Sequence, residues 1–253
     1  MSKATPTAII TGGTRGIGKA IALKLSADGY KTLITYRGDA ASAAQTAQEI
    51  RSMGGENISI QADITDQAGI SSMVDTIMNA WGRIDVLVNN AGISSNKASI
   101  ADTEPNDWTE MIDTNLHGVF NTIREVVPLM RKQGSGNIVN LSSNITKRLA
   151  PTFGAYAVSK AGLEALTIIL AKEEALHGIR VNAIAPGPIS TKMLQDLLEE
   201  MGPQKADEFV NTLPMKRVGT PQEIADMVSM LASGVSSYVT GQIIYVNGGG
   251  PAG

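Results

Sequence analysis

The sequence contains no cysteine and only two histidines among its 253 residues. Without cysteine there can be no disulfide, no thiolate nucleophile and no cysteine-ligated metal ion. His117 and His177 stand alone in the sequence and do not form the histidine cluster that a catalytic or structural metal needs. We therefore expect no metal site.

Aromatic residues and excess positive charge are also scarce. Aromatics make up 4% of the chain, and the formal net charge is -3 at pH 7. Nucleic-acid binding uses a basic surface, and single strands are commonly held on an aromatic stacking platform. The composition indicates neither, so we expect no nucleic-acid partner.

The chain has no obvious export or membrane signal. The N-terminal stretch MSKATPTAIITGG reaches two glycines after a short apolar run, so it lacks the apolar core and the cleavage site of a signal peptide. No run of about 18 apolar residues is present to span a bilayer. These features predict a soluble cytoplasmic protein without a membrane partner.

Short apolar segments alternate with longer helical patterns, and no linker, repeat or charge block interrupts them. Seven segments are typical of buried strands: 7–11, 31–36, 57–61, 84–90, 137–142, 180–186 and 242–246. Helical patterns separate the first six, near 16–28, 40–53, 66–80, 106–133 and 154–177. Their lengths suit right-handed crossovers between parallel strands. The sequence predicts one α/β domain over residues 1–253, a Rossmann fold with a doubly wound parallel sheet.

A glycine-rich turn follows the first predicted strand. TGGTRGIG, Thr11 to Gly18, has glycines at 12, 16 and 18, and the next residues, KAIALKL, have helical apolar spacing. Glycine lets the backbone turn sharply and approach a pyrophosphate, while the N–H groups at the helix start face the anion. Its position after the first strand favours a dinucleotide site over an ordinary glycine-rich turn.

Two polar residues stand out in the stretch GAYAVSKAG, Gly154 to Gly162. Tyr156 and Lys160 are four positions apart, so they share one face of a helix. An unperturbed phenol titrates near pH 10, and a neighbouring ammonium should lower its pKa and make it usable as an acid or base. Taken alone, the pair could also arise by chance on a surface helix.

Five motifs taken together identify a family. TGxxxGxG, NNAG, a serine, YxxxK and PG occur in this order, and the chain resembles the short-chain dehydrogenase/reductase family, closest to its 3-oxoacyl carrier-protein reductases. The resemblance implies that Tyr156 exchanges a proton with the carbonyl oxygen, that Ser143 holds that oxygen, and that Lys160 bonds the nicotinamide ribose. Asn115 would hold a water that links Lys160 to solvent. Strand alternation should point Ser142 to the opposite face, so we assign Ser143.

The same resemblance implies a set of cofactor contacts. Asn89 to Gly92 would flank the adenosine and support the central strand, Asp63 would contact the adenine, and Pro186 to Thr191 would grip the nicotinamide carboxamide. The full predicted set is Gly12, Thr14, Arg15, Gly16, Ile17, Gly18, Tyr36, Arg37, Asp63, Ile64, Asn90, Ala91, Gly92, Tyr156, Lys160, Pro186, Gly187, Ile189 and Thr191.

The end of the second predicted strand indicates which dinucleotide binds. A carboxylate there accepts hydrogen bonds from a ribose 2′-hydroxyl but repels a 2′-phosphate. This chain has Tyr36 followed by Arg37, and Arg15 in the glycine turn is a second cation. Two guanidiniums can bind one phosphate, so the sequence predicts NADP(H). The alternative is that both arginines are simply solvated.

Residues 190–215 contain an amphipathic pattern formed by Met193, Leu194, Leu197, Leu198 and Met201. We interpret this segment as a lid over the substrate. The alternative is a surface helix packed permanently on the domain.

The leading functional hypothesis is an NADPH-dependent reductase of 3-oxoacyl-like ketones. The alternatives are a sugar, polyol or other alcohol dehydrogenase of the family, and an inactive dinucleotide-binding sensor. Family analogy implies a homotetramer. Carrier-protein reductases tend to present basic residues where this chain has Gly134 and His177, with Arg131, Lys132 and Lys172 displaced from those positions. We therefore expect a small-molecule or thioester carbonyl substrate rather than one tethered to a carrier protein.

Overall fold

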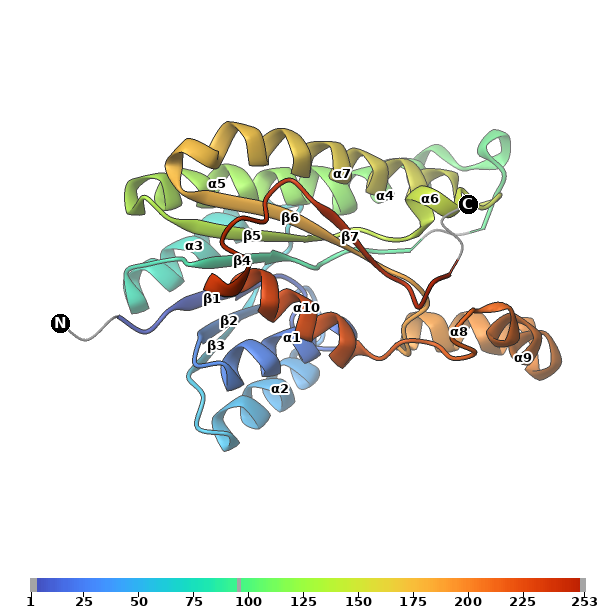
Figure 1. Ribbon diagram of the computed structural model, residues 1–253, viewed down its shortest axis with the longest axis horizontal. Helices are drawn as coiled ribbons and strands as arrows, with labels where there is room; N and C mark the ends of the chain where they lie inside the picture. Colours follow the sequence, from blue (N-terminus) through green and yellow to red (C-terminus); the bar gives the residue numbers. More distant parts are fainter. Residues whose placement is uncertain (1–3, 95–96, 251–253) are drawn as a thin grey trace.

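Seven parallel strands form the centre of the protein, in the order β3-β2-β1-β4-β5-β6-β7. The computed structural model describes residues 4–94 and 97–250 (Figure 1). The strands are β1 (Thr7–Ile10), β2 (Lys31–Tyr36), β3 (Asn57–Gln61), β4 (Val86–Asn89), β5 (Gly136–Leu141), β6 (Ile179–Pro186) and β7 (Ile243–Val246). Because all are parallel, their carboxyl ends share one edge, and the winding reverses between β1 and β4. The doubly wound fold is confirmed.

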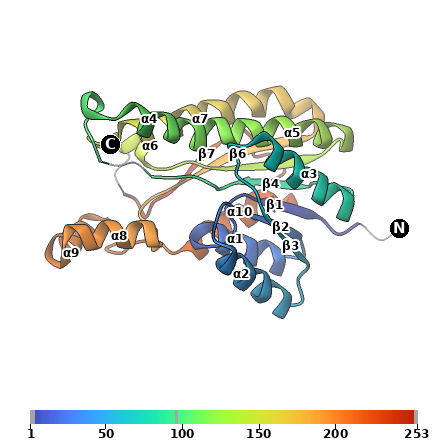
Figure 2. The same ribbon diagram turned by 180° about the vertical axis from the view of Figure 1, so that it is seen from behind.

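Helices cover both faces of the sheet (Figures 1 and 2). On one face lie α1 (Gly16–Ala27), α2 (Ala40–Ser52) and α10 (Pro221–Ala232). On the other lie α3 (Gln67–Trp81), α4 (Pro105–Ile112), α5 (Gly118–Gln133) and α7 (Gly154–Glu174). Short 3-10 turns occur at Ile100–Asp102, Ala175–His177 and Gly234–Ser236.

Alternate residues of each strand enter two separate cores. In β1, Ile9 packs into the core beneath α3, α5 and α7, whereas Ala8 and Ile10 pack into the core beneath α1 and α10. All three are fully buried. A parallel strand covered by helices on both faces must be apolar at successive positions, which is why these segments lack the alternation of a half-exposed strand.

The predicted helical segment 106–133 is not one regular helix. A π-helical turn, Asp113–His117, separates α4 from α5. Asn115 lies within this turn with no exposed surface, and its side chain bonds the backbone of Ile93 in the loop after β4. Insertions of this kind re-aim one side chain within a helix and are frequent at functional sites.

By length and composition, Gly154–His177 could cross a membrane, so the expectation that no segment is long and apolar enough to do so was wrong. In the protein, α7 packs along β6 and contacts α4 and the π-helical turn. Leu163, Thr167 and Leu170 are among the residues on its buried face. The place of this helix in the core therefore explains part of its apolar character, whereas Val158 and Ile169 on its other face are exposed.

Two helices extend beyond the carboxyl edge of the sheet (Figure 1). They are α8 (Lys192–Met201) and α9 (Pro203–Thr212), which follow β6. Leu194 is the one buried residue of α8, and α9 has none. A short helix, α6 (Ile145–Arg148), follows β5 at the same edge.

Candidate active site

The glycine turn after β1 has the geometry that an anion site requires. Gly12 and Gly16 adopt φ angles of 62° and 52°, in the left-handed region that favours glycine. A Cβ on Gly18 would lie 2.2 Å from the Gly12 carbonyl oxygen, so only glycine permits this contact. Arg15 precedes α1 without a side-chain cap, which leaves the N–H groups of the first turn available to an anion. These features fit a dinucleotide pyrophosphate.

Thr11 ties this turn to the loop after β4. Its hydroxyl oxygen accepts hydrogen bonds from the N–H groups of Asn90 and Ala91, each at 3.0 Å. The Asn90 amide donates back to the Thr11 and Gly12 carbonyls at 2.9 and 3.0 Å. Asn89 instead points into the sheet, where it donates to Asn140 Oδ1 at 2.9 Å. The two asparagines of NNAG thus bind different partners at the carboxyl edge of the sheet: Asn90 binds the glycine turn and Asn89 binds β5.

The loop after β6 approaches the glycine turn from the other side. A Cβ on Gly16 would lie 3.4 Å from Thr191 Cγ2. Pro186 O accepts a bond from Asn144 N at 2.9 Å, and Gly187 N donates to Val246 O at 2.9 Å. Of the remaining predicted residues, Thr14 and Ile189 lie in these two loops and are buried, whereas Ile17 lies in the first turn of α1 and is partly buried.

Ser143, Tyr156 and Lys160 meet where β5 ends and α7 begins. The Ser143 hydroxyl lies close enough to the Tyr156 phenol to lower its pKa. Lys160 is 5% exposed, its Nζ donates to the Leu141 carbonyl at 2.7 Å, and Nζ lies 5.9 Å from the Tyr156 ring centroid. The side chains that YxxxK predicted to share a helix face do share one.

The titration of this group differs from the sequence prediction. We expected the Lys160 charge to lower the pKa of Tyr156, but burial raises the pKa of that phenol, and the Ser143 hydroxyl only partly offsets the effect. Burial also lowers the pKa of Lys160 to about 8. The prediction was wrong for two reasons. Lys160 Nζ donates its hydrogen bond to the Leu141 carbonyl rather than to the phenol. Desolvation also disfavours the charged forms of both Tyr156 and Lys160.

Asn115 lies beside Lys160 and the NNAG loop. Its Oδ1 accepts from Ile93 N at 2.9 Å and its Nδ2 donates to Ile93 O at 3.0 Å. A Cβ on Gly92 would lie 2.9 Å from Asn115 Oδ1 and 3.6 Å from Lys160 Nζ. Glycine at position 92 therefore leaves room next to both side chains.

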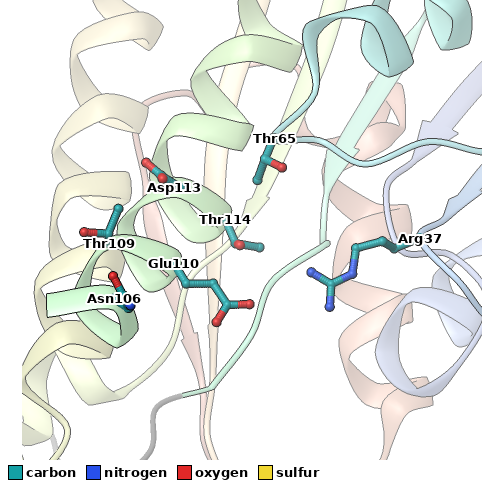
Figure 3. Close-up of a pocket in the computed structure, with 7 residues that line it drawn as sticks. All are labelled: Arg37, Thr65, Asn106, Thr109, Glu110, Asp113 and Thr114. Atoms are coloured by element: carbon teal, nitrogen blue, oxygen red, sulfur yellow. The ribbon is translucent and has the colours of Figure 1, made fainter. Parts of the chain in front are cut away.

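The predicted adenosine end is more open. A cleft of about 360 Å³ is lined by Arg37, Thr65, Asn106, Thr109, Glu110, Asp113 and Thr114. Figure 3 shows Arg37 on one wall, with its guanidinium directed across the cleft toward the wall that carries Glu110 and Thr114. Tyr36 and Arg37 follow each other at the end of β2, as predicted.

Two further predicted contacts lie in the loop after β3. The Asp63 carboxylate accepts from the N–H and hydroxyl of Thr65, at 2.9 and 2.8 Å. Ile64 is buried against Gly118, where a Cβ would lie 2.7 Å from Ile64 Cδ1. The loop is thus anchored by the buried Ile64 side chain and by hydrogen bonds between Asp63 and Thr65.

The structure adds residues that sequence reasoning missed. The Thr35 hydroxyl accepts a bond from Gly12 N at 3.1 Å, and Thr11 anchors the NNAG loop as described above. Glu164 bonds Ser142, next to the predicted serine. Glu164 could have been found from the sequence, because it continues the four-residue spacing of Tyr156 and Lys160. His117 is exposed and contacts Asp113 at 2.7 Å, which agrees with a surface position.

A family model described as Enoyl-(Acyl carrier protein) reductase matches residues 12–250. The chain shares 40% identity with the 3-oxoacyl-(acyl-carrier-protein) reductase FabG of Staphylococcus aureus strain Mu50, over 98% of both chains. The protein belongs to the short-chain dehydrogenase/reductase family.

Other members of the short-chain dehydrogenase/reductase family have different activities in their names. Glucose 1-dehydrogenase 2 of Bacillus subtilis strain 168 is 37% identical and matches 96% of this chain and 93% of its own length. The crystal structure of levodione reductase superposes with a TM-score of 0.93 at 33% identity, with 98% of both chains covered. A variant of actinorhodin polyketide ketoreductase, solved with NADPH, has a TM-score of 0.93 at 32% identity, with 97% of both chains covered.

These relatives establish the general activity of this short-chain dehydrogenase/reductase. It is an oxidoreductase that acts on CH–OH groups, resembles the 3-oxoacyl reductases, and uses a nicotinamide dinucleotide. The predicted family and enzyme class are confirmed.

Proposed function

We propose that the protein is an NADP(H)-dependent reductase of ketones, of the 3-oxoacyl type, which also oxidises the corresponding secondary alcohols. The main support is the convergence of Ser143, Tyr156 and Lys160 at the sheet edge that carries the glycine turn. The dinucleotide, when bound, supplies or accepts the hydride. The protein residues bind the substrate and handle the proton.

Ser143 and Tyr156 act on the same carbonyl oxygen. The Ser143 hydroxyl donates a hydrogen bond to this oxygen and orients it, and the Tyr156 hydroxyl donates the proton that completes the alcohol. The raised pKa of Tyr156 keeps the phenol protonated at neutral pH, which is the form that reduction requires. Oxidation uses the reverse proton transfer.

Lys160 and Asn115 support the proton transfer. Lys160, with a pKa of about 8, is mostly protonated at pH 7, and it binds the nicotinamide ribose and supplies a proton to replace the one that Tyr156 gives up. Asn115, beside it, holds a water that connects Lys160 to solvent. The close approach of both side chains to Gly92 supports this arrangement.

NADP(H) is the proposed cofactor because of the charges near the end of β2. Arg37 faces the open cleft and Arg15 is exposed at the glycine turn (Figure 3). The nearby Asp39 carboxylate caps α2, where it accepts from Ser42 N at 3.0 Å and Ser42 Oγ at 2.6 Å. Asp39 also interacts electrostatically with Arg15, so Arg37 is the guanidinium that is left to bind a 2′-phosphate.

The other proposals concern the protein as a whole. Residues 1–253 form one dinucleotide-binding and catalytic domain, with a lid at 190–215 that includes the exposed helices α8 and α9. The protein is a cytoplasmic homotetramer, by analogy with its relatives. Its substrate is a small-molecule or thioester carbonyl compound. Similarity to glucose 1-dehydrogenase 2 favours a sugar dehydrogenase as the second candidate.

A substrate panel tests the proposed function. Purified protein is mixed with NADPH or NADH and with 3-oxoacyl thioesters, diketones and simple ketones, while the absorbance of the reduced nicotinamide is followed. The reverse assay uses glucose and polyols with NADP⁺. We expect the highest kcat/KM for a 3-oxoacyl thioester or related ketone with NADPH. Turnover confined to glucose would establish the second candidate, and no turnover with any compound would refute both.

A further inference from the structure

A carboxylate lies behind the catalytic serine on the helix that carries Tyr156. Glu164 Oε1 accepts a hydrogen bond from Ser142 Oγ at 2.8 Å, and Thr146 Oγ1 lies at the same distance. The Tyr245 hydroxyl, from β7, is 3.3 Å from both carboxylate oxygens. Three hydroxyl groups from two separate segments therefore surround one partly buried carboxylate.

Two of these hydroxyls flank Ser143 in the sequence. Ser142 is the residue before it, and Thr146 Oγ1 is also 3.0 Å from the Ser143 carbonyl oxygen. The Glu164 contacts thus hold the short segment that contains the catalytic serine from both sides. Hydrogen bonds to an ionised carboxylate are stronger than those between neutral groups, so the segment has little freedom to shift.

The helical spacing connects this segment to the other catalytic groups. Tyr156, Lys160 and Glu164 follow one another at four-residue intervals and form one stripe along α7. The position of Ser143 is consequently set against the same helix that positions the phenol. The Ser143 and Tyr156 hydroxyls, which must contact the same carbonyl oxygen, are therefore both positioned by α7.

The chain between Ser143 and Tyr156 is strained and needs such support. Leu149 and Thr152 have φ angles of 46° and 71°, in the left-handed region that non-glycine residues rarely adopt. For a β-branched residue such as threonine this conformation is particularly unfavourable. Strained segments persist where the surrounding contacts determine their conformation.

We propose that Glu164 is a positioning residue for catalysis: through Ser142 and Thr146 it fixes the Ser143 hydroxyl at the distance from Tyr156 that carbonyl reduction requires. The inference rests on the proposed function. It assigns no proton transfer to Glu164, which acts only through its neighbours.

The first test substitutes the carboxylate. Glu164→Ala should lower kcat about 10- to 100-fold, because a displacement of about 1 Å in a catalytic group has effects of this size. The Kd of NADPH, measured by fluorescence, should change less than about threefold. Glu164→Gln keeps an amide oxygen as acceptor and should recover most of the activity. Glu173→Ala, which removes an exposed carboxylate of the same helix, is the matched control and should keep kcat within about twofold.

The deciding test is a double-mutant cycle with Ser143→Ala, measured under single-turnover conditions. If Glu164 acts through Ser143, Glu164→Ala should cost less than about threefold in the Ser143→Ala background. An equal loss in both backgrounds, or an unchanged kcat for Glu164→Ala, overturns the proposal. A merely structural role would give the equal loss.

Thermal unfolding of each variant checks that the fold is retained. Should Glu164→Ala fail to fold, Ser142→Ala replaces it in the cycle, with an expected loss of about 3- to 10-fold that disappears in the Ser143→Ala background. Wild-type protein without ketone reduction refutes the proposed function and this inference together. Wild-type turnover combined with an additive cycle refutes the inference alone.

Discussion

The two ends of the predicted dinucleotide site differ in how their polar groups are held. At the catalytic end, Lys160 is 5% exposed and Asn115 is fully buried, and both donate hydrogen bonds to backbone carbonyls. At the adenosine end, Arg15 and Arg37 are exposed, and Arg37 faces an open cleft (Figure 3). Burial shifts the pKa values of Tyr156 and Lys160 at the first end.

The polar groups at the two ends differ in burial because the two ends have different functions. Proton transfer needs groups whose pKa values and positions are fixed before the substrate arrives, which burial and backbone hydrogen bonds provide. Discrimination between dinucleotides needs charges that can reach a phosphate. Substitutions of Ser143 and Tyr156 should therefore change kcat with little effect on cofactor affinity, and substitutions at the adenosine end should do the opposite.

The largest expected effect is that of Tyr156→Phe at the catalytic end. It removes the proton donor but keeps the ring, so kcat should fall by about 10²–10⁴ while the Kd of NADPH stays within about twofold. Single-turnover kinetics and cofactor titration measure the two quantities. If the variant kept more than a tenth of the wild-type rate with chemistry rate-limiting, the assignment of Tyr156 would be wrong.

Arg37→Ala should have the next largest effect, at the opposite end. Loss of a charged hydrogen bond worth about 1.5–3 kcal/mol should raise the Kd of NADPH roughly 10- to 150-fold and leave the Kd of NADH nearly unchanged. Arg51→Ala, at an exposed arginine of α2, is the control. The prediction fails if the wild type binds both cofactors within a factor of two and Arg37→Ala does not change this.

Lys160→Met tests whether burial at the catalytic end is costly. A pKa lowered from 10.5 to about 8 means that the folded state disfavours the charged lysine below pH 8, where the unfolded state is equally protonated. At about 1.4 kcal/mol per pKa unit, less about 1 kcal/mol for the lost bond to Leu141 O, the variant should gain about 2–3 kcal/mol of stability at pH 7.

The stability gained by Lys160→Met should decrease as pH rises. Between pH 8 and pH 10.5 the unfolded state binds more protons than the folded state, so the wild type gains stability as pH rises and the gap to Lys160→Met closes. Urea denaturation at pH 7 and pH 9.5 measures it, with Lys172→Met, at an exposed lysine of α7, as control. A gap that stays constant with pH would contradict the lowered pKa.

The smallest expected effect concerns a carrier protein. Arg131, one of the cations displaced from the docking positions, forms a bidentate ion pair with Glu174. The Glu174 side chain is 1% exposed, and Arg131 Nε donates to Glu174 Oε2 at 2.8 Å. This engagement weakens its availability to an acidic partner. We expect kcat/KM for a carrier-bound 3-oxoacyl chain to be lower than that for the same chain on a small thiol, by up to about threefold. A hundredfold carrier advantage that collapses at high salt would reverse this conclusion.

The strands and the main motifs could be predicted because each depends on local patterns. Buried parallel strands are continuous apolar runs, the glycine turn depends on backbone conformations that only glycine adopts easily, and YxxxK depends on helical periodicity. The positions of these elements in the structure match the sequence prediction to within a few residues, and β2 and β3 match it fully.

What the sequence could not supply depends on contacts between distant segments. The π-helical turn at Asn115 exists next to the loop after β4, and the raised pKa of Tyr156 results from burial by the assembled fold. The partners of Glu164 lie on the segment after β5 and on β7. The ion pair of Arg131 with Glu174 joins residues 43 positions apart, so no local pattern predicts it.

Isotope transfer tests most directly whether this site transfers hydride between NADP(H) and a ketone. The best ketone of the panel is reduced with NADPH deuterated at one C4 position, then at the other, and the alcohol is analysed by mass spectrometry. The account predicts one deuterium at the carbinol carbon with one of the two labels and none with the other, at a rate that Tyr156→Phe lowers by about 10² or more. An alcohol that is unlabelled with both cofactors, or labelled at an unchanged rate by Tyr156→Phe, would contradict it.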